Sequence, residues 1–196
     1  MSPILGIIAS SKLSAVGDFE SIATVTVGSG GAASIEFTSI PSTYTHLQVR
    51  AFAQTNRGTY GIDQLLVRFN GDGTGSTSYA YHNLIGNGAT AVAGSVGTSG
   101  NFLGFGEGSF GTSTGGTFGG GILDILDYTN TNKYTTTRSL SGVDINGTIA
   151  GYGGWITMSS GLYMNTNAIT EIDILPSVGT LITQYSHFAL YGIRSA

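Results

Sequence analysis

Two short runs near the end of the chain constrain the fold most strongly, because both alternate between apolar and polar residues. They cover residues 168–175 and 187–194. Alternate residues of a β-strand point to opposite faces, so each run can place one apolar face on a core. The residues that share a face are Ile172 with Ile174, and Phe188 with Leu190. A final strand this apolar would aggregate as a free edge, so we expect it to be paired centrally in a sheet.

Similar runs recur along the chain and predict an all-β protein. They are rich in β-branched and aromatic residues and are bounded by turn residues. No amphipathic helix of three turns is present in the sequence. The predicted strands cover residues 22–27, 34–37, 47–53, 64–69, 79–84, 122–128, 134–140, 152–158, 169–175 and 188–193. About ten strands at this spacing are typical of an antiparallel β-sandwich, jelly-roll-like in architecture, and the first two strands should form a hairpin.

The segment 86–121 has a different character from the rest of the chain. Glycine occurs at almost every third position, with Phe102, Phe105, Phe110 and Phe118 between the glycines. Because glycine has no side chain to pack, it weakens strands. Part of the segment could pair as strands, but we expect it to be mainly irregular, of the kind that forms a functional loop or a packed surface.

The length of 196 residues is typical of one domain. We expect a single β-sandwich domain over residues 19–196, preceded by an apolar leader over residues 1–18. The leader is too short to cross a membrane, which needs about 20 apolar residues. It also lacks the basic start of a signal peptide.

The leader has two alternative roles, and both depend on its aliphatic residues. It could be the first strand of its own sheet, or a docking strap that adds to a neighbouring subunit or to a particle surface. Its position ahead of a small polar link favours the strap. The expected docking residues are Ile4, Leu5, Ile7 and Ile8.

Charge is sparse, and this bears on the partners of the chain. Only 9% of the residues are charged, against roughly 25% in an average protein. Few charges keep copies apart, so we expect a homo-oligomer with closed symmetry. The net charge of −4 and the presence of only two lysines argue against a nucleic-acid partner. Cysteine is absent, which excludes disulfides and thiolate chemistry.

Candidate catalytic and metal-binding residues do not form a recognised pattern. The three histidines lie in separate predicted strands without the local spacing of zinc ligands, so no metal site is expected. No lysine follows the glycine-rich stretches as in a phosphate loop, so no cofactor is expected. Asp124 and Asp127 have an odd spacing, which places them on opposite faces of one strand rather than in a carboxylate pair. The chain is therefore predicted not to be an enzyme, although Asp63, Asp124, Asp127 and Glu171 could still converge in a glycan hydrolase.

Aromatic residues suggest a further alternative, a secreted carbohydrate-binding module of the lectin type. Aromatic rings can stack on sugar rings, but they also fill the faces of a sandwich, and the sequence leaves both readings open. The candidate glycan contacts are Tyr79, Tyr81, Tyr152 and Trp155.

Both ends of the chain and one early strand resemble small virion proteins of tailed bacteriophages. The resemblance lies in residues 2–11, 37–50, 169–172 and 186–193. It implies a non-enzymatic, jelly-roll-like component of the virion surface, serving as a head decoration or as a tail fibre or adhesin. The implied partners are other copies of the chain, most simply in a trimer, other virion proteins and host surface polysaccharide. It implies neither a nucleic-acid partner nor insertion into a membrane.

Overall fold

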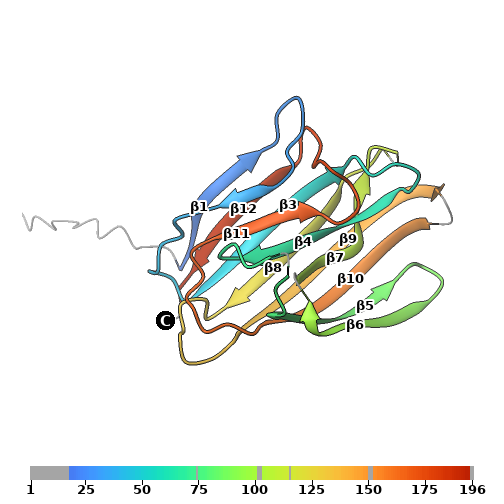
Figure 1. Ribbon diagram of the computed structural model, residues 1–196. Coiled ribbons are helices and arrows are strands. Elements are labelled where there is room, and N and C mark those ends of the chain that lie inside the picture. Colours follow the sequence, from blue (N-terminus) through green and yellow to red (C-terminus); the bar gives the residue numbers. More distant parts are fainter. Residues whose placement is uncertain (1–17, 74, 101–102, 115, 150–151, 195–196) are drawn as a thin grey trace, which may run out of the picture.

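The chain folds into β-strands and the loops that join them. A computed structural model describes residues 18–73, 75–100, 103–114, 116–149 and 152–194. Within these ranges there are twelve strands and no helix, which confirms the all-β prediction with two strands more than expected (Figure 1). It follows that this part of the chain has no helix able to cross a membrane.

The strands follow one another along the chain with short connections. In order they are β1 (Phe19–Thr26), β2 (Ile35–Phe37), β3 (His46–Thr55), β4 (Ile62–Phe69), β5 (Tyr79–Gly86), β6 (Ala91–Gly100), β7 (Leu103–Thr112), β8 (Gly119–Leu126), β9 (Thr135–Ile149), β10 (Tyr152–Tyr163), β11 (Ile172–Pro176) and β12 (His187–Ile193).

The strands form two layers of unequal size. The large sheet has the order β1-β12-β3-β8-β9-β10-β5-β6, and the small sheet has the order β2-β11-β4-β7. Within each layer the neighbours are antiparallel. The layers join where the end of β3 runs parallel to β7 at Gln54 and Thr55. Figure 1 shows β1 and the β5–β6 hairpin at opposite ends of the large sheet. The predicted sandwich is thus confirmed.

The core lies between the layers and is built by the alternation seen in the sequence. Phe188 and Leu190 of β12 are fully buried, as are Ile172 and Ile174 of β11. The two runs lie in different layers, since β12 pairs with β1 and β3 while β11 pairs with β2 and β4. The expected central pairing of the last strand is confirmed.

The prediction of an irregular glycine-rich segment is wrong, because residues 86–121 contain β6, β7 and the start of β8. β7 lies against the inner face of the large sheet, and glycine permits that close approach. A Cβ at Gly104 on β7 would lie 3.2 Å from the Tyr81 ring of β5, and one at Gly121 on β8 would lie 3.0 Å from the Phe105 ring of β7. Here glycine is required by packing between layers, which outweighs its low strand propensity.

The predicted hairpin of the first two strands is also wrong. β1 pairs with β12 in the large sheet, and β2 pairs with β11 in the small sheet. Between them the chain turns through Gly30 and Gly31, which have φ of 126° and 75°. Glycine adopts such positive φ values without steric cost. The glycines therefore carry the chain from one layer to the other instead of folding it back on itself.

Candidate functional site: the open face of the large sheet

The large sheet has one face against the small sheet and one open face, which no other described segment covers. Cross-strand pairing sets a continuous apolar row on the open face of β8, β9, β10 and β5. We call this row the apolar ridge. Its four side chains are 40–57% exposed, unusually high for large aliphatic groups that lie side by side. They are Ile122, Leu140, Met158 and Leu84.

A row of three glycines runs beside the ridge and is interrupted on β10 by the exposed side chain of Ile156. Register pairs Gly120 of β8 with Gly142 of β9, and the row continues through Ile156 of β10 to Gly86 of β5. Phe52 closes the row on β3, where its ring stacks on Phe118 at a centroid distance of 4.9 Å. We call Gly120, Gly142 and Gly86 the glycine groove. Because these residues have no side chains, the surface is lower here than at the ridge.

A polar row borders the other side of the ridge. Gln48 Nε2 donates to Asp124 Oδ1 at 2.8 Å, and Arg138 donates to Asp124 Oδ2 through Nε at 3.1 Å and through a terminal nitrogen at 3.0 Å. Arg50 Nε donates to Gln48 Oε1 at 2.9 Å, which extends the network along β3. Hollows of about 440 and 340 Å³ on this face are both lined by Arg138 and Met158. The polar row fixes the position of a cation beside the apolar ridge.

This arrangement is suited to docking rather than to chemistry. Counting roughly 100 Å² for each half-exposed large side chain, the ridge with Phe52 and Ile156 presents about 600 Å², the upper end for the largest apolar patch of an ordinary monomer. Patches of this size mark interaction surfaces. The open face is therefore the candidate functional site.

The sequence analysis did not identify the ridge, although a signal for it was present. In β8 and β10 apolar residues occupy neighbouring positions, as in Ile122 beside the buried Leu123. Such strands have apolar groups on both faces, which is typical of a strand covered on both sides. Only the register shows that the outer residues of four strands line up.

Two of the four acidic residues named for a hydrolase, Asp63 and Asp124, lie in different layers. Asp63 lies in β4 of the small sheet and is fully buried. Its carboxyl oxygens accept bonds from Thr55 Oγ1 at 2.8 Å and from the backbone nitrogens of Gln64 and Gly179 at 2.8 and 3.0 Å. Asp124 lies on the open face of the other layer. A pair of carboxyls acting on one sugar must converge on it, and Asp63 and Asp124, which lie in different layers, form no such pair.

Asp127 lies just beyond the end of β8 and is held by a cation. Lys133 Nζ donates to Asp127 Oδ2, and this bond lowers the pKa of the carboxyl from its ordinary value. His46 Nδ1 accepts from the Asp127 backbone nitrogen at 2.9 Å, so this histidine serves the turn after β8. No group of three His, Asp or Glu residues able to hold a metal occurs in the described part of the chain.

Two of the four expected glycan contacts are wrong. Tyr79 and Tyr81 point into the core, at 0% and 5% exposure. Tyr79 Oη accepts from the Phe69 nitrogen and donates to the Asp72 carbonyl, both at 2.8 Å. Residues of β5 alternate between the two faces of the sheet as expected, and Tyr79 and Tyr81 lie on the buried face. The side chain of Tyr152 lies outside the described residues.

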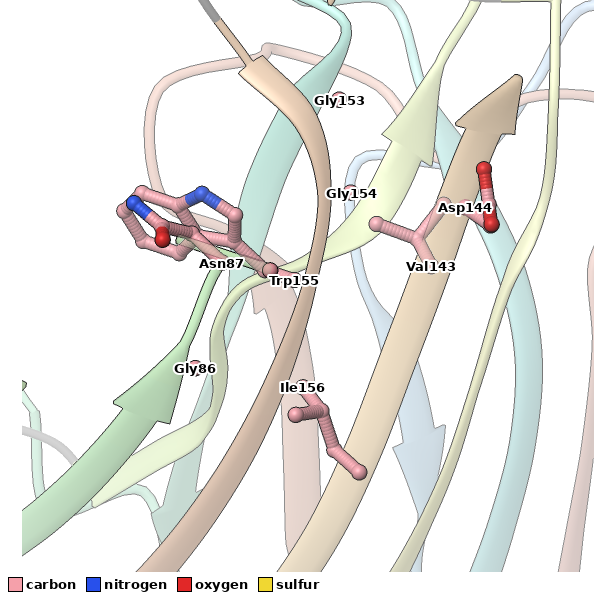
Figure 2. A pocket seen from close by; sticks show the side chains of 9 residues that line it. Gly86, Asn87, Val143, Asp144, Gly153, Gly154, Trp155 and Ile156 are labelled. Carbon is pink, nitrogen blue, oxygen red and sulfur yellow. The ribbon is translucent and has the colours of Figure 1, made fainter. Parts of the chain in front are cut away.

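Trp155, the fourth expected glycan contact, lines a hollow of about 400 Å³ together with Asn87 and Asp144 (Figure 2). Trp155 pairs with Val143, and Gly154 pairs with Asp144. Neighbouring residues of a strand point to opposite faces, so the indole and the Asp144 carboxylate diverge, as Figure 2 shows. Asn87 Oδ1 accepts bonds from the nitrogens of Ala89 and Thr90 at 3.0 and 2.8 Å, within its own turn. The volume of the hollow suits a small ligand, but the polar groups that line the hollow do not converge on one point.

The expected docking residues of the leader, Ile4, Leu5, Ile7 and Ile8, lie outside the described residues. Within the described chain β1 begins at Phe19, one residue beyond the leader as defined from the sequence.

Comparison with known proteins adds little to this geometry. No family model matches the chain, and no curated protein matches it. Among solved structures, the chain is similar to a functionally unknown protein from Saccharomyces cerevisiae, at 9% identity over 79% of this chain and 85% of that one, with a TM-score of 0.23. A likeness at this level carries no argument about fold or function.

Proposed function

We propose that this chain is a non-enzymatic structural protein of a tailed-phage virion surface, and that it is held in its assembly through the open face. The observation that carries the assembly role is the apolar ridge of Ile122, Leu140, Met158 and Leu84, exposed on a paired, regular sheet. Burying a large apolar side chain contributes about 1.5–3 kcal/mol relative to leaving it exposed to water, so each ridge residue would gain stability from a partner that covers it. A contiguous apolar row of this kind is therefore typical of a surface that is covered in the assembled state.

The virion part of the proposal is supported by the resemblance of residues 2–11, 37–50, 169–172 and 186–193 to small phage virion proteins. The placement of the acidic residues favours a role without catalysis, since Asp63 serves the interior and Asp124 is paired with Arg138. The role as a head decoration and the role as a tail fibre or adhesin are both consistent with a docked sandwich.

Reconstruction of purified virions tests the location. The sandwich should be visible on the head or on the tail, with its open face against a neighbour and not toward solvent. Absence of the chain from purified virions, by mass spectrometry, would contradict the proposal.

A matched pair of variants tests whether the open face is responsible. Leu140→Glu places a charge on the ridge, and Val178→Glu places one at an exposed loop residue away from it, with starting exposures of 51% and 60%. Both variants should fold, and only Leu140→Glu should be lost from particles. Equal incorporation of the two variants would show that the ridge is not the docking surface.

The leader remains a second proposed contact, as a strap onto a neighbouring subunit or the particle. Deletion of residues 2–9 should leave the melting temperature nearly unchanged, because the described core is closed by the pairing of β1 with β12. The shortened chain should no longer join particles. Insolubility of the shortened chain would indicate that the leader belongs to the fold instead.

A carbohydrate-binding role is the second candidate, and one observation favours it: Trp155 is partly exposed beside a hollow of about 400 Å³. Binding of the isolated chain to a glycan array, abolished in Trp155→Ala, would support this role. Array binding that Trp155→Ala retains would exclude the hollow as its site.

A further inference from the structure

Resting on the assembly role proposed above, we propose that the occupant of the open face is a second copy of this chain. The two copies pack face to face about a two-fold axis that crosses the strands between the apolar ridge and the glycine groove. Three properties of the face support this arrangement: the match between the apolar ridge and the glycine groove, the position of the charged residues, and the apolar area.

The first property is that the ridge and the groove are related by the symmetry that such a dimer needs. A two-fold axis at the level of Ser141 on β9 exchanges Leu140 with Gly142, so Leu140 lies over Gly142 of the partner. The same axis exchanges Ile122 with Gly120 on β8, and Leu84 with Gly86 on β5. Packed sheets are about 10 Å apart and interdigitate their side chains. A large residue over a glycine is the most compact form of that packing.

On β10 the two-fold axis brings two large residues together. Met158 then lies over the partner's Ile156, and both are 57% exposed in the single chain. Methionine is flexible and fills irregular gaps, so this contact can adjust. Aligned sheets twist against each other by about 30°, so the match is best on the central strands β9 and β10 and falls off toward the ends of the face.

The second property is the charge on β9. The axis at Ser141 also exchanges Arg138 with Asp144. Arg138 has a side chain that is 69% exposed even while it pairs with Asp124, and Asp144 is exposed on the same face. Each Arg138 would therefore lie over Asp144 of the other copy, once at each side of the axis. Two unlike pairs at these positions fix the antiparallel register of the dimer.

The third property is area. About 600 Å² of apolar surface on each copy gives about 1,200 Å² for the pair, which reaches the lower bound of stable protein interfaces. The polar row on one side and the Phe52–Phe118 stack on the other add to that area. The resemblance to phage appendages implies three copies, whereas this face is self-complementary for two.

A charge-reversal experiment tests the contact between positions 138 and 144. Arg138→Asp alone places two carboxylates over each other at both contacts, and Asp144→Arg alone places two guanidinium groups there. Each variant should weaken the dimer by about tenfold or more. An equimolar mixture should restore it, because both contacts of the mixed dimer then join unlike charges. Arg138→Asp also faces Asp124, but this holds in the single variant and in the mixture alike.

The control uses the same charge change away from the face. Asp18→Arg lies in the exposed segment before β1; placed in the same chain as Arg138→Asp, it offsets the change in net charge without restoring the contact, so this double variant should dimerise as weakly as Arg138→Asp alone. Light scattering gives the mass of each sample, and circular dichroism confirms that each variant is folded. A wild-type monomer or trimer at micromolar concentration would overturn the proposal, as would a mixture with Asp144→Arg that stays as weak as its components.

The dimer and the virion role can be tested independently of each other. A wild-type dimer with the expected charge behaviour that is absent from purified virions would retain the dimer and refute the virion role. A monomer in solution that is present in virions through its open face would retain the virion role and refute the second copy as occupant.

Discussion

Thr55 donates a hydrogen bond to Asp63 at 2.8 Å across the point where the two sheets join, and both residues are fully buried. The same carboxyl accepts from the backbone nitrogens of Gln64 and Gly179. One side chain thus joins β3, β4 and the loop before β12. The joint between the layers is polar, and its stability depends on every donor keeping its acceptor.

Asp63→Ala should lower the free energy of unfolding by about 3–5 kcal/mol, since three donors, one buried and two part-buried, would lose their acceptor. Thr55→Val removes only one of those donors, and its cost should be about 1–2 kcal/mol. Urea unfolding of the two variants gives both values. Glu36→Gln, at an exposed position, is the control and should stay within about 0.5 kcal/mol of the wild type. A Thr55→Val cost equal to that of Asp63→Ala would contradict this account.

Gly120 and Gly121 are neighbours in β8 but face opposite sides of the large sheet. Substitution by alanine should therefore affect the stability of the chain differently at the two positions. A Cβ at Gly121 would lie 3.0–3.1 Å from the rings of Phe105 and Phe110 and from Ser141, whereas at Gly120 its nearest neighbour is 4.0 Å away. Gly121→Ala should therefore destabilise the chain by about 1–3 kcal/mol through overpacking. Gly120→Ala should be neutral or slightly stabilising, because alanine restricts the unfolded chain. Thermal unfolding of the two variants measures both changes in stability. Equal changes would mean that the side chains around Gly121 move to make room for the added methyl group.

The behaviour of these glycines shows where sequence reasoning succeeded and where it could not. Period-2 alternation placed Phe188, Leu190, Ile172 and Ile174 correctly on buried faces, because that rule depends only on neighbouring residues. Whether Gly121 weakens a strand or lets two layers approach depends on Phe105 and Ser141, which are distant in the sequence. Local patterns hold no information of that kind.

The candidate site was missed for the same reason. Leu140 and Met158 are ordinary strand residues in the sequence, and only the register of β9 with β10 sets them side by side. Tyr79 and Tyr81 were candidate glycan contacts because alternation identifies the two faces of a strand without saying which one is covered, so the sequence could not decide between sugar stacking and core filling. One strand of the covering layer is β7, which lies in the segment where glycine argued against a strand.

Alkaline pH should destabilise the fold through two buried tyrosines. Burial raises the pKa of Tyr163 to about 12 and raises that of Tyr79 further in the same direction, against about 10 for an unfolded tyrosine. The protonated rings contribute stability that is fully present below pH 10 and is lost as the pH rises through about 12. Urea unfolding at pH 9, 10 and 11 should show falling stability.

The tyrosine explanation has a direct control. Tyr163→Phe cannot ionise, so its stability should fall less steeply above pH 10 than that of the wild type, by about 1.4 kcal/mol per pH unit for one group. Absorbance of tyrosinate should also rise late in the wild type, after the exposed tyrosines have titrated. Identical pH profiles for the two proteins would assign the alkaline loss to other groups.

The last prediction concerns the contact of Tyr44 with Gly192, which ties the loop before β3 to the last strand. A Cβ at Gly192 would overlap the Tyr44 ring, whose hydroxyl donates to Glu20 at 2.9 Å and whose face lies 5.0 Å from the Arg194 guanidinium. Gly192→Ala should displace the ring and cost about 1–3 kcal/mol.

In Tyr44→Ala the ring is absent, so adding Gly192→Ala should cost almost nothing further. The double variant would then be more stable than the sum of the two single costs implies, with a coupling of about 1–2 kcal/mol. Thermal unfolding of the four proteins in this cycle measures that coupling. Additive costs would mean that the alanine at position 192 acts on the strand backbone and not on the Tyr44 ring.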